Sequence, residues 1–219
     1  MERHHILIWD LPTRLFHWSL VVLFLLSWWS GAQGGTAFKI HQWSGCAILS
    51  LLLFRLAWGL VGSEYARFAQ FVRGPRRVLR SVAELLTATP LAQAGHNPLG
   101  GWMVVALLLS MLLQAVTGLF ANDDIMNEGP LVARIGKDLS DTLSGVHGVN
   151  FAILLGLVSV HVLAIVYHRR RKGEHLTRAM ITGRRLLPAP ATTPRIASNW
   201  LAAVLLALAA GMVAVLINL

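Results

Sequence analysis

The chain has 219 residues, of which 55% are hydrophobic and only 13% charged, and its mean hydropathy is +0.60. This composition excludes an ordinary water-soluble domain. The net charge of +9 does not indicate nucleic-acid binding, because the basic residues lie in short segments between long apolar runs. The single cysteine, Cys46, excludes an intrachain disulfide and any paired-thiol attachment of a cofactor.

Five apolar segments reach the roughly 20 residues that a helix needs to cross a membrane. They are residues 15–31, 41–61, 99–120, 146–167 and 199–219. The first segment could instead be a secretory signal peptide, but its length and the histidine within it, His17, favour a membrane span. The sequence therefore predicts an all-α integral membrane bundle.

A proline-rich stretch follows the fourth span and predicts a linker over residues 186–198. We therefore expect residues 1–185 to form one transmembrane domain with four spans. The last segment, residues 199–219, is expected to be an additional helix outside that domain.

The distribution of Lys and Arg predicts the orientation of the chain in the membrane. Fifteen of these residues lie in the N-terminal tail and in the connections over 62–98 and 168–198, whereas three lie on the opposite side and Arg55 lies within a span. In a bacterial inner membrane this predicts a cytoplasmic N-terminus and, after five spans, a periplasmic C-terminus.

Four of the nine histidines lie within the predicted spans, where ionisable side chains are costly and mark functional sites. The alternating direction of the spans places His17 and His161 near the cytoplasmic face and His41 and His147 near the outer face. The 14 residues between His147 and His161 rise about 21 Å in nearly whole helical turns, so both histidines share one helix face. The sequence therefore predicts two sites, His17 with His161 and His41 with His147.

A pair of imidazoles fills both axial positions of a haem iron, as low-spin electron-transfer haems require. We therefore expect two haems b, held without covalent bonds. Arg55 follows His41 by the same spacing of 14 residues and is expected to bind a haem propionate; alternatively, it extends to the cytoplasmic interface.

The other interpretations of the histidines are weaker. A single interior histidine is usually a hydrogen-bonded packing residue, but four at matched depths favour ligands. A metal transporter would usually add intramembrane carboxylates, and the predicted spans contain none. The remaining histidines are expected to be interfacial or solvated: His4, His5, His96, His168 and His175.

Several short motifs carry a resemblance to a known family. They are Trp9 to Trp18, His41 to Gly45, Phe54 to Gly59 with Gly62 and Ser63, His96 to Trp102, Gln114 to Gly118, and Met180 to Gly183. Over residues 6–185 the sequence resembles the bacterial cytochrome b561 family, which includes the cytochrome b subunits of nickel-iron hydrogenases. The resemblance implies a four-helix di-haem bundle with His17, His41, His147 and His161 as iron ligands. The fifth span lies outside the family pattern.

The main functional hypothesis is an electron-transfer subunit of a respiratory oxidoreductase, connecting the quinone pool to a c-type cytochrome or another periplasmic redox protein. The alternative is a self-sufficient superoxide:quinone oxidoreductase, which would benefit from a positive outer surface. The predicted outer loop, residues 121–142, instead has five acids and two bases. Such a loop suits a basic redox partner. A haem-free membrane anchor or transporter is a third interpretation, which an optical spectrum would exclude or establish.

Overall fold

The computed structural model describes residues 3–85, 95–188 and 194–218. Within these ranges, five helices are long and apolar enough to cross a membrane, which confirms the predicted all-α integral membrane bundle. They are α1 (Leu11–Gln33), α2 (Phe38–Val61), α5 (Pro98–Gly118), α6 (Lys137–Lys172) and α8 (Asn199–Asn218).

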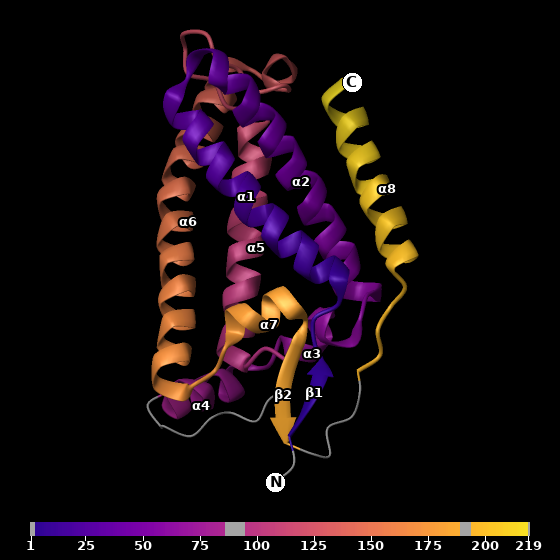
Figure 1. The fold of residues 1–219 in the computed structure, drawn as a ribbon. Helices are drawn as coiled ribbons and strands as arrows, with labels where there is room; N and C mark the ends of the chain where they lie inside the picture. Colours follow the sequence, from indigo (N-terminus) through magenta and orange to yellow (C-terminus); the bar gives the residue numbers. More distant parts are fainter. Residues whose placement is uncertain (1–2, 86–94, 189–193, 219) are drawn as a thin grey trace.

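Helices α1, α2, α5 and α6 form the bundle, and α8 lies alongside α2 (Figure 1). The N-terminal end of the bundle carries the short elements β1 (Arg3–Leu7), η2 (Glu64–Ala66), α3 (Phe68–Phe71), α4 (Pro75–Leu85), α7 (Leu176–Thr182) and β2 (Arg184–Pro188). The opposite end, called the loop end below, carries η1 (Gly35–Ala37), the loop over residues 119–136 with η3 (Val132–Arg134), and the C-terminus.

Helix α6 begins well before residue 146, where the sequence placed the start of its span. Its first turns are polar and include Asp138 and Asp141, so hydropathy alone detects only the apolar part of the helix. As a result the loop is shorter than the predicted 121–142. These two acids lie on the helix rather than in the loop.

A two-stranded antiparallel sheet, absent from the sequence prediction, ties the two ends of the transmembrane domain together. Strand β1 pairs with β2 from Arg3 opposite Pro188 to Leu7 opposite Arg184. The predicted linker over 186–198 therefore begins as strand. Gly183, in the left-handed conformation with φ of 78°, accepts N–H groups of Ile8 and Trp9 on its carbonyl at 2.7 and 3.0 Å. A Cβ at this position would lie 2.6 Å from the Trp9 carbonyl oxygen, so only glycine fits.

The additional helix α8 packs on α2 through small side chains, with Ala202, Ala209 and Val213 buried. Small residues let membrane helices approach closely. Just before α8, the backbone N–H of Ala197 donates to Ser63 Oγ at 2.9 Å, and the backbone N–H of Arg195 donates to the Glu64 carboxylate at 3.0 Å. The described end of the linker is therefore fixed to the transmembrane domain.

Asp10 connects the start of α1 to α2. One carboxylate oxygen accepts the backbone N–H of Thr13 at 2.7 Å and caps α1, while the other accepts the indole N–H of Trp58 at 3.0 Å. Asp10 is 2% exposed and Trp58 is fully buried. This carboxylate fixes both the first turn of α1 and the packing of α2 against it.

Replacement of Asp10 by alanine should destabilise the bundle by at least about 2 kcal/mol. A lost helix cap costs about 1 kcal/mol, and a buried indole N–H without an acceptor costs about 1–3 kcal/mol more. Thermal or denaturant unfolding in detergent measures the loss. Asn97→Ala is the control, because Asn97 caps α5 at 2.6 Å without a second recorded role. Equal losses in the two variants would contradict the bridging role of Asp10.

Candidate functional site

A cavity of about 460 Å³ lies among α1, α2, α5 and α6 toward the loop end. Its wall is largely apolar and includes the aromatic side chains of Phe24, Trp28 and Phe151. His41 and His147 face each other in this wall, with ring centres 6.2 Å apart and ring planes at 81°. The cavity therefore places two imidazoles from different helices opposite each other.

Each of these imidazoles is oriented by a backbone carbonyl. His41 Nδ1 lies 2.8 Å from the Ser27 carbonyl oxygen, and His147 Nδ1 lies 3.0 Å from that of Gln114. A carbonyl only accepts hydrogen bonds, so both Nδ1 atoms carry the proton and both Nε2 atoms keep a free lone pair. Hydrogen bonding of the second nitrogen is typical of histidines that bind metals.

The spacing of the two rings suits one metal ion between them. A metal bonds an imidazole nitrogen at about 2 Å, and the ring centre lies about 1 Å behind that nitrogen, which gives about 6 Å between two ring centres. The observed 6.2 Å agrees. Two axial imidazoles in a largely apolar cavity fit a haem iron.

Two glycines leave room for these rings. A Cβ at Gly118 would lie 2.9 Å from His147 Cε1, and a Cβ at Gly31 would lie 2.8 Å from His41 Nδ1. Gly45 and Gly148 also line the cavity, but an added Cβ at either meets no protein atom within 4 Å.

A buried polar cluster supports the carbonyl that holds His147. The Asn150 side-chain N–H group donates to Gln114 Oε1 at 2.7 Å and to the Ser110 carbonyl at 2.9 Å, and the Ser110 hydroxyl donates to Asn150 Oδ1 at 3.0 Å. Asn150 is 5% exposed. These bonds fix α5 against α6 one turn from the ring. The sequence signal that could have indicated this polar cluster is a single asparagine within an apolar run.

The other predicted pair, His17 and His161, lies toward the N-terminal end. The two side chains are close enough for charges on them to repel each other. His17 Nδ1 is buried and has no hydrogen-bond partner among the described residues. The structure thus brings the rings of His41 and His147 together, whereas a shared site between His17 and His161 stays a prediction.

Arg55 is buried at the N-terminal end of the bundle, with 3% of its surface exposed. Its Nη2 donates to the Ala66 carbonyl at 3.0 Å, and its guanidinium lies 5.0 Å from the centre of the Phe68 ring. Its Nη1 is buried without a partner in the described part of the chain. The negative Asp10 carboxylate interacts electrostatically with the positive Arg55 guanidinium.

His96, expected to be interfacial or solvated, is half-buried at the N-terminal end. Its ring centre lies 4.6 Å from that of Trp9 and 4.9 Å from that of Phe71. Burial lowers the pKa of His96 to about 3, with further lowering by positive charge on Arg55, His161 and His17. The imidazole is therefore neutral.

His168 was also expected at the interface but is 7% exposed, and its Nδ1 lies 3.1 Å from the Glu174 carboxylate. His5 is exposed on β1. His4 lies in β1, and His175 directly precedes α7. His5 and His175 are exposed and His168 pairs with Glu174, so none of these three joins the two histidine pairs.

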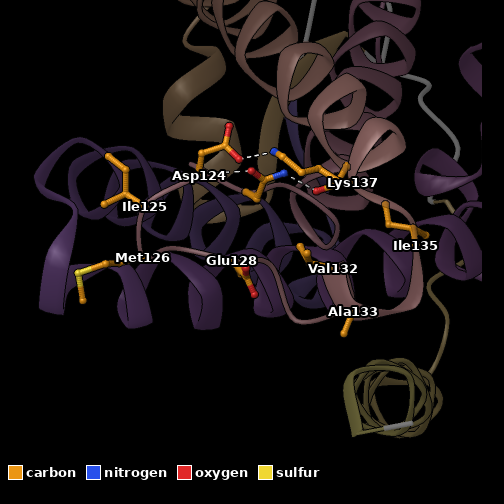
Figure 2. A pocket seen from close by; sticks show the side chains of 10 residues that line it. Asp124, Ile125, Met126, Glu128, Val132, Ala133, Ile135 and Lys137 are labelled. Atoms are coloured by element: carbon orange, nitrogen blue, oxygen red, sulfur yellow. Dashed lines mark hydrogen bonds and ion pairs between the residues drawn. The ribbon is translucent and has the colours of Figure 1, made fainter.

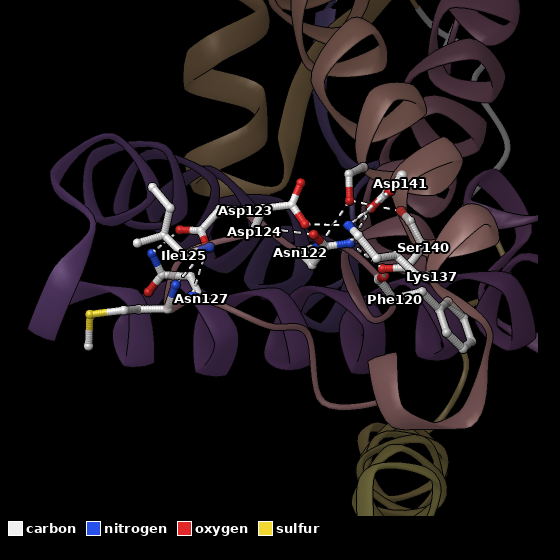
Figure 3. Close-up of polar contacts among 11 residues, drawn as sticks. Phe120, Asn122, Asp123, Asp124, Ile125, Asn127, Lys137, Ser140 and Asp141 are labelled. Atoms are coloured by element: carbon white, nitrogen blue, oxygen red, sulfur yellow. Dashed lines mark hydrogen bonds and ion pairs between the residues drawn. The ribbon is translucent and has the colours of Figure 1, made fainter.

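The loop over residues 119–136 has a defined backbone (Figure 3). Asp123 Oδ1 accepts the backbone N–H groups of Ile125, Met126 and Asn127 at 3.0, 3.0 and 2.9 Å. The hydrogen bonds from Asn127, and then that from Ile125, hold the pKa of Asp123 well below its usual range. Lys137 at the start of α6 pairs with Asp124, and also with Asp141 at 3.0 Å.

A hollow of about 430 Å³ lies between this loop and the start of α6 (Figure 2). Ile125 and Met126 are 84% and 87% exposed at the loop tip, and the Glu128 carboxylate points away from the pair of Asp124 and Lys137. The Glu128 carbonyl accepts the Gln42 side-chain N–H at 2.6 Å. The loop is thereby joined to α2 at the cavity that contains His41.

Residues 8–183 match the family model described as prokaryotic cytochrome b561. The chain belongs to the prokaryotic cytochrome b561 family. A relative, the probable Ni/Fe-hydrogenase B-type cytochrome subunit of Rhizobium leguminosarum bv. viciae, is 25% identical over 227 residues, which cover 85% of this chain and 91% of the relative. No solved structure gives a significant match. This cytochrome b561 is therefore a multi-pass membrane b-type cytochrome that acts in electron transfer, and its cofactor is haem b.

Gly118→Ala should disturb the loop-end site of this cytochrome b561, because the new methyl group would push the His147 ring away from the Gln114 carbonyl. We expect a lower haem content and a cost of about 1–3 kcal/mol for overpacking. Haem per chain and unfolding in detergent measure both effects.

Gly156→Ala is the control on α6, because that position is exposed and an added Cβ meets nothing within 4 Å. It should retain the full haem content. A Gly118→Ala protein with unchanged haem content and stability would contradict the close approach of His147.

Proposed function

We propose that this cytochrome b561 holds two haems b and transfers electrons between the quinone pool and a redox partner at the loop end. The facing imidazoles of His41 and His147, each with Nδ1 bonded to a carbonyl, are the observation that carries the proposal. The pair of His17 and His161 supplies the second site, and Arg55 binds a propionate there. The quinone part of this proposal rests on the resemblance to the cytochrome b561 family.

Haem b, when bound, supplies one-electron chemistry. The chain contributes two neutral imidazoles to each site, which leaves no iron position open for a substrate. At the loop end, the carbonyls of Ser27 and Gln114 make the ligand nitrogens more basic and hold the rings in place. Because the rings do not turn, little rearrangement accompanies gain or loss of an electron.

The excess of Lys and Arg supports an orientation with the N-terminal end in the cytoplasm of a bacterium and the loop end in the periplasm. Electrons would then cross the membrane between the two histidine pairs, which are separated by about 21 Å along α6. The loop-end site is the exchange point for the external partner.

The loop favours a basic redox protein, such as a c-type cytochrome, over an anionic substrate such as superoxide. The structure identifies which acids are available for docking. Asp123 holds the loop together, and Asp124 and Asp141 bind Lys137. Glu128 and Asp138 are exposed and have no recorded ion pair within the described residues. These two are the carboxylates that a partner can use.

The unaltered protein should contain two haems per chain in a pyridine haemochrome assay. His147→Ala should lose only the loop-end haem and His161→Ala only the other, because each change removes one ligand at one depth. Optical spectra before and after reduction distinguish the remaining sites.

His168→Ala is the matched control on the same helix, since His168 pairs with Glu174 away from both sites. It should retain both haems. A single haem in the unaltered protein would overturn the di-haem proposal.

Glu128→Gln combined with Asp138→Asn should slow electron exchange with a basic c-type cytochrome several-fold at low salt. The loss follows from weaker electrostatic attraction, and added salt should reduce the difference between the two proteins. Stopped-flow spectroscopy measures the rates.

Arg134→Gln, which removes an exposed positive charge from the same loop, should raise the rate. Electron-transfer rates that change neither with salt nor in any of these variants would refute the docking proposal. A faster rate in the double variant would favour an acidic partner or an anionic substrate.

A further inference from the structure

Five buried side-chain nitrogens at the N-terminal end have no hydrogen-bond partner among the described residues: Arg14 Nε, His17 Nδ1, Arg55 Nη1, Arg67 Nε and His96 Nδ1. We consider two of them, Arg55 Nη1 and His96 Nδ1. Buried polar groups almost always have a partner, so a buried nitrogen without one is a candidate to bind a ligand. One guanidinium and one neutral imidazole together offer N–H donors. Their natural partner is an anion.

His96 is held in a fixed position. Its ring packs against Trp9 and Phe71, with centres 4.6 and 4.9 Å away. The next residue, Asn97, caps α5 by accepting the backbone N–H of Gly100 at 2.6 Å. A Cβ at Gly101 would lie 2.6 Å from the Phe71 carbonyl, so the start of α5 and α3 are in close contact. The imidazole therefore cannot easily turn out toward water.

The position of His96 relates it to the second histidine pair. The Arg55 guanidinium lies 5.0 Å from the centre of the Phe68 ring, and the rings of Phe68, Phe71 and His96 follow one another at centre distances of 5.7 and 4.9 Å. Positive charge on Arg55, His161 and His17 also acts on the His96 ring. Each comes from a different part of the bundle: α1, α2, the residues just before α5, and α6. Asp10, which interacts with Arg55, is the acidic group recorded beside them.

A haem b carries two propionate carboxylates on one edge of its ring. If a haem were held by His17 and His161, these carboxylates would need hydrogen-bond donors wherever they are shielded from water. Arg55 offers a charged donor whose Nη1 is unused, and His96 offers a neutral one. Each of the two propionate carboxylates can therefore have one hydrogen-bond donor.

We propose that His96, together with Arg55, binds the propionate carboxylates of the haem between His17 and His161, with His96 Nδ1–H as a hydrogen-bond donor. This inference rests on the proposed function, since it requires a haem at that site. It makes His96 a positioning residue that also adjusts the reduction potential.

The expected direction follows from charge. A propionate's negative charge stabilises ferric over ferrous iron, and a donor to that carboxylate offsets the effect. Loss of the His96 donor should therefore lower the midpoint potential of this haem. The midpoint potential of the loop-end haem, which lies at the other depth, should not change.

The test compares His96→Phe, which keeps an aromatic ring against Trp9 and Phe71, with His96→Asn, which places an amide N–H near the position of Nδ1. Redox titration followed by optical spectroscopy gives the potentials of both haems in the full-length protein. We expect a lowered potential for one haem in His96→Phe, a potential near the unaltered value in His96→Asn, and an unchanged second haem in both.

Two bound haems with unaltered potentials in His96→Phe would overturn the inference. So would loss of quinol oxidation at unchanged potentials, which would make His96 a quinone contact. If His96→Phe loses one haem, retention in His96→Asn supports the donor role, whereas loss in both variants assigns His96 to packing and overturns it. Fewer than two haems in the unaltered protein would instead refute the proposed function.

Discussion

The hydrogen bonds from two imidazoles to the carbonyls of Ser27 and Gln114 are the interactions on which the loop-end site depends. A helix carbonyl in a membrane normally bonds only within its own helix, so each of these oxygens accepts an additional donor from a neighbouring helix. The bond to Ser27 joins α2 to α1, and the bond to Gln114 joins α6 to α5. The same two hydrogen bonds therefore hold neighbouring helices together and orient the imidazole rings.

The sequence was sufficient to predict the spans and the four histidines, because both depend on simple regularities. Apolar runs must reach a set length to cross a membrane, and 14 residues bring His147 and His161 to one helix face. In the structure the rings of His41 and His147 lie 6.2 Å apart, and the pairing of His17 with His161 stays a prediction. The start of α6 was harder to locate, since its polar first turns have no apolar signature.

What the sequence could not predict arises from contacts between distant segments. Strands β1 and β2 are separated by most of the transmembrane domain, so neither has a local pairing signal. His96 lies at the edge of an apolar run, where an interfacial position was reasonable. It is half-buried, with Nδ1 shielded from water, because Trp9 and Phe71, from two other parts of the chain, pack on its ring. Burial of this kind depends on tertiary structure and has no periodicity.

Several residues in the motifs shared with the cytochrome b561 family have structural roles at the N-terminal end. Asp10 caps α1 and accepts the indole N–H of Trp58, and Asn97 caps α5. The Gly183 carbonyl accepts the two N–H groups just after β1, in a conformation that only glycine adopts readily. Their common task is to fix the ends of helices that carry His17, Arg55 and His96. The family motifs therefore describe a scaffold as well as ligands.

At the loop end, different residues fix the backbone and form the exposed surface. One carboxylate, Asp123, fixes the backbone by accepting three N–H groups, while the side chains of Ile125 and Met126 contact little of the protein. Those two positions can exchange side chains without refolding the loop, since its shape depends on backbone donors that every residue except proline possesses. Recognition at this surface can therefore diverge during evolution while the site beneath it is conserved.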